Sequence, residues 1–488
     1  MRPSPLAELA RVVGASSPDD PERLIGPDVV IDSRQTTPGA LFVALPGERA
    51  DGHDFVAEAA AHGAGAALVA PGRLDPAAPP LPLLEVSQPL AALAQLARHI
   101  VAAQHHHLTV AGLTGSAGKT TTKDLLAQTL ATAGDTVAPA GSFNNQIGLP
   151  LTAARVDDAT RYLVAELGAR HLGDIADLAA IVAPDIGLVL NVGWAHLGQF
   201  GSVEATAAAK GELIAALPPN GWAVLNQDDP LVAGLARLHR GPTAWFSDRG
   251  RPQAPGQLAV WADRIEADPG QSHGFTLHAS GHPSAQVQLR LIGRHQVANA
   301  VAAAAVALAA GLDLADVAAA LSQAEARSHW RLQLERRRDG LMVVNDAYNA
   351  NPDSMRAALE TAAGLRRARA VDHPQGRWTA VLGDMLELGP AAADWHRQVG
   401  QWAARAGVDR LVAVGQWAPD LAAGARQAGA GAVEVVEAAT AAQAAQQLGP
   451  LGGDDLVLVK ASRGVGLEAV ALGLLEQPGE TAETGAPC

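Results

Sequence analysis

Residues 108–126, LTVAGLTGSAGKTTTKDLL, contain the pattern that decides the fold of this chain. A short apolar run opens the stretch, and a glycine-bearing turn, a lysine, three threonines and leucines on one face of a helix follow. This order is typical of P-loops, because glycines let backbone N–H groups converge on phosphate oxygens at a helix N-terminus. The stretch predicts a nucleotide site, and a glycine-rich turn that binds nothing is the alternative.

The residue types of the loop suggest what each side chain does. Lys119 would reach the β- and γ-phosphates of ATP, and the Thr120 hydroxyl would bind Mg²⁺. The general P-loop pattern has its first glycine where this chain has Leu113, so the glycine spacing departs from that pattern. We expect the whole loop to contact the nucleotide: Thr114, Gly115, Ser116, Ala117, Gly118, Lys119, Thr120 and Thr121.

Composition restricts the class of protein. The chain has 488 residues, about three domains by the usual size of a domain, and 48% hydrophobic residues, enough for large cores. Its net charge of −14 argues against a nucleic-acid partner or an acidic membrane surface. One cysteine, Cys488, fits a reducing compartment, and no apolar stretch is long enough to span a membrane. We expect a cytoplasmic protein without membrane insertion, and a monomer.

The order of apolar runs, polar turns and helical patterns predicts an α/β protein with three domains. Residues 1–87 form a small α/β unit, and residues 88–324 form a P-loop domain with a mostly parallel sheet and helices on both faces. Residues 325–476 repeat the same rhythm as a Rossmann-like α/β domain, and residues 477–488 are expected to be a flexible tail.

Several polar residues follow apolar runs, at the sheet edge where open α/β sheets bind ligands. Glu166 and His196 are placed there and could hold a second divalent ion near the triphosphate. Lys210 lies within an alanine-rich helix, where a solvated surface lysine is the ordinary interpretation. Residues 105–107 are three consecutive histidines, which cannot share one face, so a solvated strand entry is favoured over a metal site.

Together these motifs resemble the Mur ligases, ATP-dependent amide ligases of peptidoglycan precursor synthesis. The resemblance covers almost the whole chain, and its strength is the shared order of short blocks. The blocks that resemble the family are residues 32–34, 47–53, 114–120, 141–150, 166–168, 196–198, 210–212 and 293–299. Two further blocks, 346–352 (DAYNANP) and 383–389 (GDMLELG), resemble the family member that uses D-alanyl-D-alanine.

The resemblance implies further roles. Lys210 would be carbamylated (N6-carboxylysine) and would hold Mg²⁺ together with Thr120, Glu166 and His196, and Arg331 would reach the γ-phosphate. Lys119, Lys210, His196 and Arg331 would be catalytic. The nucleotide would also contact His295, Asn299, Asp346 and Tyr348, although a helix cap is the alternative for Asn299. The substrates would contact Ser33, Arg34, Glu48, Asp51, His53, Asn144, Asn145, Asn349, Lys460, Ser462 and Arg463.

The implied reaction joins D-alanyl-D-alanine to UDP-N-acetylmuramoyl-tripeptide through an acyl phosphate, with UDP bound by the first domain. Another Mur ligase or a folylpolyglutamate-type ligase is the nearest alternative, and a P-loop kinase or regulatory ATPase is the alternative from another class. The chain departs from the family twice, with Trp330 and Ala461 at positions where the family has glycine. A positive φ at position 461 would be strained by alanine, and Trp330 bears on the assignment of Arg331.

Overall fold

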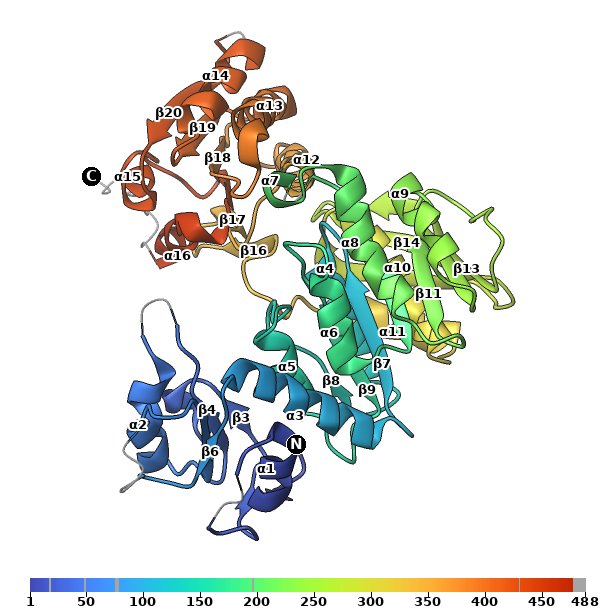
Figure 1. The fold of residues 1–488 in the computed structure, drawn as a ribbon. Helices are drawn as coiled ribbons and strands as arrows, with labels where there is room; N and C mark the ends of the chain where they lie inside the picture. The colour runs from blue at the N-terminus through green and yellow to red at the C-terminus, as the bar shows by residue number, and fades with distance from the viewer. Residues whose placement is uncertain (17–18, 48–49, 75–78, 195–196, 430, 477–488) are drawn as a thin grey trace, which may run out of the picture.

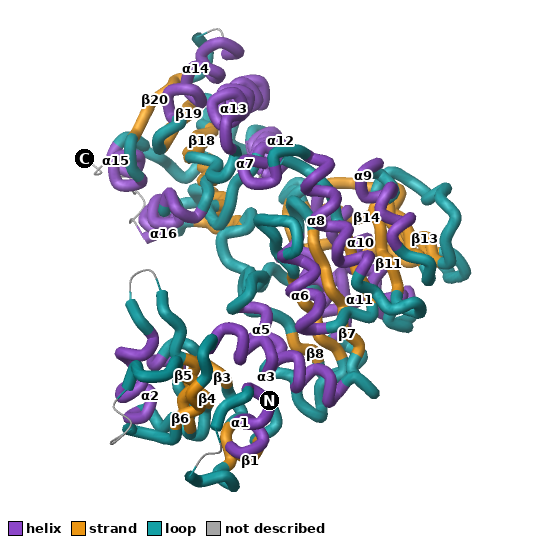
Figure 2. Tube along the Cα trace, viewed as in Figure 1, coloured by secondary structure: helices purple, strands orange, loops and turns teal. Residues whose placement is uncertain are grey.

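The structure is a computed structural model that describes residues 1–16, 19–47, 50–74, 79–194, 197–429 and 431–476. Three regions follow one another along the chain, coloured blue, cyan to yellow, and orange to red in Figure 1. Each region is built around its own β-sheet with helices packed on it (Figure 2). The α/β class with three domains is confirmed. Two predicted site residues, Glu48 and His196, and the tail from residue 477 lie outside the described residues.

The N-terminal region has a sheet of four parallel strands in the order β3-β4-β5-β6. Its strands are apolar on both faces, because α1 packs on one face and α2 on the other. The elements are β1 (Ser4–Pro5), α1 (Leu6–Val13), β2 (Leu24–Ile25), β3 (Val29–Val30), η1 (Ser33–Gln35), β4 (Leu41–Val43), η2 (Gly52–Phe55), α2 (Val56–Ala61), β5 (Ala66–Val69) and β6 (Leu83–Glu85).

A single helix, α3 (Pro89–Gln104), connects the N-terminal and central regions. Leu93 and Leu96 are buried in the core of the N-terminal sheet. Ala97 and Val101, one turn further along, are buried in the core of the central sheet. The same helix therefore contributes to both cores, which ties the two regions together.

The central region has a sheet of nine strands in the order β15-β14-β13-β12-β11-β10-β7-β9-β8. All neighbours from β8 to β13 are parallel, and only the β13–β14 and β14–β15 pairs are antiparallel, so the predicted mostly parallel sheet is confirmed. The strands are β7 (Thr109–Thr114), β8 (Thr136–Val137), β9 (Tyr162–Glu166), β10 (Ile186–Val189), β11 (Trp222–Asn226), β12 (Thr243–Ser247), β13 (Leu258–Ala267), β14 (Ser272–Ala279) and β15 (Ala285–Ile292).

Helices cover both faces of the central sheet, as predicted. Helices α4, α10 and α11 share one core with the sheet, and α3, α5, α6 and α8 line the other face. No described helix is both long and apolar enough to cross a membrane. The helices are α4 (Lys119–Leu130), α5 (Gly148–Ala153), α6 (Asp174–Val182), α7 (Leu197–Phe200), α8 (Val203–Ala215), α9 (Pro230–Ala233), η3 (Gly234–Leu238), α10 (His295–Ala309) and α11 (Leu314–Gln323).

The C-terminal region has a six-stranded sheet in the order β16-β17-β21-β18-β19-β20, parallel except for β16. Its elements are β16 (Gln333–Arg336), β17 (Met342–Asp346), α12 (Pro352–Arg369), β18 (Trp378–Gly383), η4 (Gly389–Ala391), α13 (Ala392–Ala406), β19 (Arg410–Val414), α14 (Ala418–Gly429), β20 (Glu434–Ala438), α15 (Ala441–Gln446), β21 (Leu456–Lys460), η5 (Arg463–Val465) and α16 (Glu468–Glu476). The proposed domain limit at residue 324 falls just after α11 and well before β16.

The central and C-terminal regions touch through α7. The backbone N–H of Gly198 donates to the carbonyl oxygen of Glu387 at 3.1 Å. A Cβ atom on Gly389 would lie 2.6 Å from the Cα atom of Gly198, so this contact admits no side chain there. Arg170 adds an ion pair with Glu387 at 3.3 Å. The two regions are therefore in direct backbone contact on the side of the central sheet that carries the phosphate loop.

Candidate functional site

The predicted phosphate loop lies between β7 and α4, where the strand ends at Thr114 and the helix begins at Lys119. Gly118 precedes the helix with a φ of +83°, a conformation that glycine adopts without strain. A Cβ atom at Gly118 would lie 2.4 Å from Oδ1 of Asn299. Asn299 on α10, predicted to contact adenine, is therefore packed against the loop itself.

Asn191 holds the loop in place from the neighbouring strand β10. Its Oδ1 atom accepts a hydrogen bond from the Ala117 N–H at 2.9 Å, and its Nδ2 atom donates to the Ala117 carbonyl at 3.1 Å. Ser116 donates its N–H to the Asn191 carbonyl, and the Gly193 N–H donates to Ser116 Oγ at 2.8 Å. The sequence reasoning left Asn191 out of the site, although its position directly after a buried strand was the available signal.

Lys119 is half-buried at the start of α4. Its Nζ atom donates to the Gly115 carbonyl at 2.6 Å, and no carboxylate among the described residues forms an ion pair with it. Burial lowers the pKa of Lys119, Glu166 partly opposes this, and Arg331 lowers the pKa further. Glu166 and Arg331 are far from Lys119 in sequence, but both lie close enough to it in space to change its pKa.

A hydrogen-bonded cluster surrounds Glu166 at the end of β9. The Thr120 hydroxyl lies 2.6 Å from Ser142 Oγ and donates to Glu166 Oε1 at 3.3 Å. Asn144 Nδ2 donates to the same Oε1 atom at 2.8 Å. The second carboxylate oxygen, Oε2, is buried and has no hydrogen-bond partner. Glu166 therefore has one oxygen available for a cation, beside the threonine predicted to bind Mg²⁺.

Lys210 on α8 is buried, with only 4% of its surface exposed, so the solvated-lysine interpretation is wrong. Burial, followed by the positive charge of Lys119, lowers the pKa of Lys210 to about 7. No described residue pairs with its amino group. The described residues include no cluster of three or more His, Cys, Asp or Glu suited to a metal ion, and the predicted set would need His196, which is not described.

Arg331 connects the C-terminal region to the phosphate loop. It lies in the segment between α11 and β16, and its Nη2 atom donates to Ser142 Oγ at 2.8 Å. Its guanidinium carbon lies 4.3 Å from the ring centroid of Tyr348, within cation–π range. Its Nε atom is buried and has no hydrogen-bond partner. The structure therefore brings this predicted γ-phosphate ligand next to the phosphate loop.

The predicted contacts at the carboxyl edge of the C-terminal sheet are largely satisfied within the protein. Asp346 Oδ2 accepts from Lys460 Nζ at 2.6 Å, and Oδ1 accepts from the Leu332 N–H at 3.0 Å. Lys460 also donates to the carbonyl of Asn349. Ser462 is buried and accepts from a backbone N–H. Of the three predicted residues Lys460, Ser462 and Arg463, only Arg463 is exposed to solvent.

Three other predicted contacts, Asn144, Asn145 and His295, have different surroundings. Asn144 joins the Glu166 cluster, whereas Asn145 accepts two backbone N–H groups at the start of α5. His295 opens α10, and burial, together with the charge of Lys460, lowers its pKa to about 4. The His295 imidazole is therefore neutral at pH 7 and lies between the central sheet and the C-terminal region.

The predicted UDP contacts lie on the N-terminal sheet and not beside the phosphate loop. Ser33 is buried, and Arg34 is exposed and paired with Asp32 at 2.7 Å. His53 Nδ1 lies 2.6 Å from Asp51 Oδ1, and His53 Nε2 accepts the N–H of Ala70. Both His53 nitrogens are thus used within the protein, and the His53 hydrogen bonds lower the pKa of Asp51. The sequence predicted that these residues follow strands and bind one ligand. In the structure they follow β3 and β4 at the same edge of the sheet.

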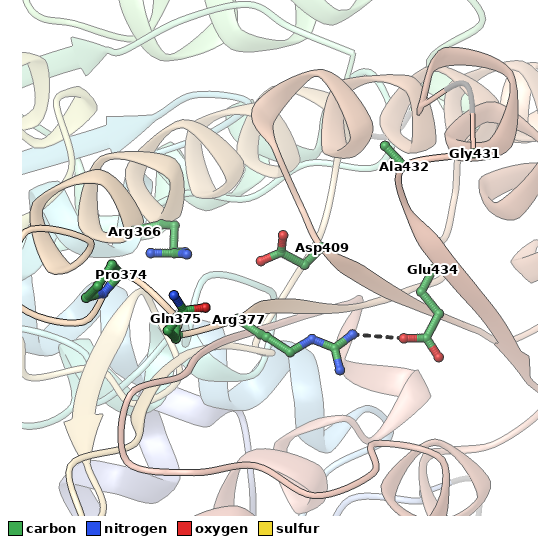
Figure 3. Close-up of a pocket in the computed structure, with 9 residues that line it drawn as sticks. Arg366, Pro374, Gln375, Arg377, Asp409, Gly431, Ala432 and Glu434 are labelled. Atoms are coloured by element: carbon green, nitrogen blue, oxygen red, sulfur yellow. Dashed lines mark hydrogen bonds and ion pairs between the residues drawn. The ribbon is translucent and has the colours of Figure 1, made fainter.

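The three histidines at residues 105–107 are not part of any group of three or more His, Cys, Asp or Glu suited to a metal ion among the described residues. Elsewhere, a surface pocket of about 650 Å³ opens at the amino ends of β18, β19 and β20 (Figure 3). Arg377 pairs there with Glu434 at 2.9 Å, and Arg366 and Asp409 also line the pocket. This pocket is at the sheet edge opposite Lys460, so it is not part of the nucleotide site.

The two departures from the family glycines behave differently. Ala461 is fully buried and is not among the residues with positive φ, so alanine fits there without backbone strain. Its methyl group packs towards Gly383, where a Cβ atom would lie 2.8 Å away. Trp330 has a φ of +59°, a conformation that is unusual for a large side chain and was not predicted there, and Leu332 has a φ of +50°. Arg331 therefore lies between two residues in left-handed conformations.

Comparison with known proteins was made with family profiles, curated sequences and solved structures. Three profiles match in chain order: "Mur ligase family, catalytic domain" at residues 28–100, "Mur ligase middle domain" at 113–307, and "Mur ligase, glutamate ligase domain" at 330–463. The UDP-N-acetylmuramoyl-tripeptide--D-alanyl-D-alanine ligase of Mycobacterium tuberculosis (strain ATCC 25618 / H37Rv) is 44% identical, with 96% of both chains covered.

Solved structures agree with the sequence comparison. A crystal structure of MurF from Acinetobacter baumannii has a TM-score of 0.82 and 32% identity, covering 98% of this chain and 100% of that one. MurF ligase from Thermotoga maritima in complex with ADP has a TM-score of 0.74 and 28% identity, covering 92% and 97%. These findings set aside the kinase and regulatory-ATPase alternatives. The chain belongs to the Mur ligase family of ATP-dependent ligases.

Proposed function

We propose that this ligase joins D-alanyl-D-alanine to the terminal carboxylate of UDP-N-acetylmuramoyl-tripeptide, which yields the UDP-linked pentapeptide. The observation that carries the proposal is the pair of cations at the phosphate loop, Lys119 and Arg331, which have no acid partner among the described residues, with the buried amine of Lys210 nearby. Relatives that align over 96% of the chain are named for these two substrates, which supports the choice of substrates. A ligase that uses ATP and a UDP-linked precursor is proposed to act in the cytoplasm.

The chemistry explains why the cations are needed. A free carboxylate does not react with an amine in water, because oxide is a poor leaving group. Transfer of the γ-phosphoryl group of ATP to the carboxylate gives an acyl phosphate, from which the dipeptide amine displaces inorganic phosphate. The carboxylate and the γ-phosphate repel each other, and Lys119 and Arg331 are positioned to neutralise that repulsion. Lys119 already points along the loop backbone, where incoming phosphate would replace the Gly115 carbonyl as its partner.

Mg²⁺ is expected beside the phosphate loop. Oxygen ligands suit this ion, and the unpartnered Oε2 atom of Glu166 and the Thr120 hydroxyl beside it supply two of them. The ion would add positive charge against the developing charge on the transferred phosphoryl group. We include His196 in the ligand set on the family resemblance alone.

Lys210 is proposed to carry a carbamate that supplies a further oxygen ligand. A lysine with a pKa near 7 is largely unprotonated above neutral pH, and only an unprotonated amine attacks CO₂. Incubation with ¹³C-bicarbonate should give a carbamate carbon signal that is absent from Lys210→Met and present in Lys123→Met. A wild-type spectrum without this signal would contradict the modification while leaving the ligase reaction open.

The proposed reaction is tested by phosphate release. Release should require UDP-N-acetylmuramoyl-tripeptide and D-alanyl-D-alanine together, and mass spectrometry should detect the pentapeptide product. Release that ignores both substrates would contradict the proposal. Parallel assays with lysine and with diaminopimelate as the third residue of the peptide determine which tripeptide is used.

A further inference from the structure

Trp330 and Leu332 are held in a strained turn on either side of Arg331. Their φ angles of +59° and +50° are outliers for large side chains and are strained. Glycine would adopt this conformation without strain. A strained residue persists only where the surrounding structure fixes it, so the strain calls for a function of the Trp330 side chain.

Hydrogen bonds fix both ends of this turn to the segment after β17. The Trp330 carbonyl accepts the N–H of Tyr348 at 3.2 Å, and the Leu332 N–H donates to Asp346 Oδ1 at 3.0 Å. Asp346 is in turn held by the buried Lys460 at the end of β21. Three segments that are distant in sequence therefore meet at one place, at the carboxyl edge of the C-terminal sheet.

Four side chains stack in this place. The Arg463 guanidinium carbon lies 4.8 Å from the centroid of the Trp330 ring and 5.3 Å from that of Tyr348. The Arg331 guanidinium carbon lies 4.3 Å from the centroid of the Tyr348 ring. Arg331 also donates a hydrogen bond to Ser142 beside the phosphate loop. All three ring distances are within the range of about 6 Å for cation–π attraction. The stack thus runs from the ATP site to Arg463.

Arg463 is exposed, and no carboxylate of the described residues pairs with it. Stacking of a guanidinium on aromatic rings leaves its N–H edges free for a bidentate contact with a carboxylate. The predicted UDP contacts are on the N-terminal sheet, so the UDP-linked substrate would approach from that side. Because that leaves the C-terminal side for the second substrate, we take Arg463 to face D-alanyl-D-alanine, whose only anionic group is its terminal carboxylate.

We propose that Trp330 is a positioning residue that holds the Arg463 guanidinium for the terminal carboxylate of the incoming dipeptide. This role rests on the proposed function. It adds that Arg463 is the group that recognises the terminal carboxylate of the dipeptide. Trp330 itself touches neither the substrates nor the phosphates. It acts through the orientation of Arg463, at the cost of a strained backbone.

The test compares D-alanyl-D-alanine with its C-terminal amide, which lacks the carboxylate. Trp330→Gly should raise the KM for the dipeptide about fivefold, which is the worth of about 1 kcal/mol of cation–π attraction. Its KM for the amide, its KM for ATP and its kcat should stay unchanged. Trp330→Phe should restore the wild-type KM, and Trp261→Phe, which alters another tryptophan stacked with an arginine, is the matched control.

An equal rise of KM for the dipeptide and the amide, or no rise at all, would overturn the role of Trp330. Relief of strain by glycine opposes the loss of the ring and the larger entropy of the unfolded chain, so the unfolding midpoint of Trp330→Gly should stay close to that of the wild type. A KM effect accompanied by a lower midpoint would point to a packing defect and would also overturn the inference. Wild-type enzyme that forms no amide with the dipeptide would instead contradict the proposed function, on which the inference rests.

Discussion

Buried lysines occur at two sheet edges of this molecule in opposite settings. At the phosphate loop, Lys119 and Lys210 have no carboxylate partner among the described residues, and burial lowers the pKa of both. At the C-terminal sheet, Lys460 is buried like Lys210 but pairs with Asp346 at 2.6 Å. Burying an unpaired ammonium is costly, so a protein that does so holds the charge ready for a ligand. The paired lysine supports the fold, whereas Lys119 is proposed to meet a phosphate and Lys210 to be carbamylated.

One helix shows the same contrast. Lys123 lies one turn after Lys119 on α4 and is buried, but it pairs with Asp124 and donates to the carbonyls of Pro139 and Gly141. It fixes the loop that precedes Ser142, a residue of the phosphate site. Two lysines four residues apart therefore have different tasks, because only Lys123 has a carboxylate partner among the described residues.

The largest effect is expected from Lys119→Ala. Loss of one charge contact to the transferred phosphoryl group should lower kcat about 10³-fold, near the upper end for a single stabilising group. Binding of the UDP-linked substrate, measured by calorimetry, should be unchanged, since its predicted contacts are on another sheet. Wild-type turnover by Lys119→Ala would contradict the assignment of the unpaired lysine to phosphoryl transfer.

Lys460→Met should instead act on stability. It leaves the carboxylate of Asp346 buried and unpaired, which typically costs about 3 kcal/mol. Denaturant unfolding should show this loss, whereas Lys119→Met should show none. A double variant, Lys460→Met with Asp346→Leu, should recover most of the stability because no charge is left buried. If Lys460→Met were as stable as the wild type, the paired lysine would not be a structural one.

Lys210→Met should lower kcat about 10²-fold and yet stabilise the protein at acidic pH. Below pH 7 the folded and unfolded states both carry the ammonium, and only the folded state bears the cost of burying it. Between about 7 and 10.5 the folded lysine is neutral while the unfolded one is protonated, so wild-type stability rises with pH.

The advantage of Lys210→Met is therefore expected to be greatest below pH 7 and to vanish towards pH 10. Thermal unfolding at several pH values in bicarbonate-free buffer measures it, and Lys123→Met serves as the control that should be destabilised at every pH. A variant less stable than the wild type at pH 6 would contradict the assignment of Lys210 as an unpaired buried amine.

The smallest effect is expected from Ala461→Gly. Because Ala461 does not need a positive φ, glycine gains nothing there and loses a buried methyl group, for a cost of about 1 kcal/mol. Activity should be unchanged. The contrast with Trp330→Gly, which should relieve strain, compares the two departures from the family glycines directly.

Much of the site followed from local pattern. The loop at residues 114–121, Glu166 at a strand end and the parallel central sheet were all predicted, because periodicity and glycine spacing are local properties. Asn191 was missed, although it fixes the loop, because an asparagine after a strand has many uses. Lys210 gave no local sign of burial, since the alanine-rich sequence around it would suit a surface helix equally well.

By itself, the sequence determined that this chain is an α/β protein with a nucleotide loop, and the resemblance of its ordered motifs identified the kind of ligase. Only the tertiary structure decided which charges are paired. The pKa of Lys210, the partner of Lys460 and the stacking of Arg463 on Trp330 depend on residues far away in the chain. Desolvation and charge pairing are set by distances in space, and no local pattern of residues encodes them.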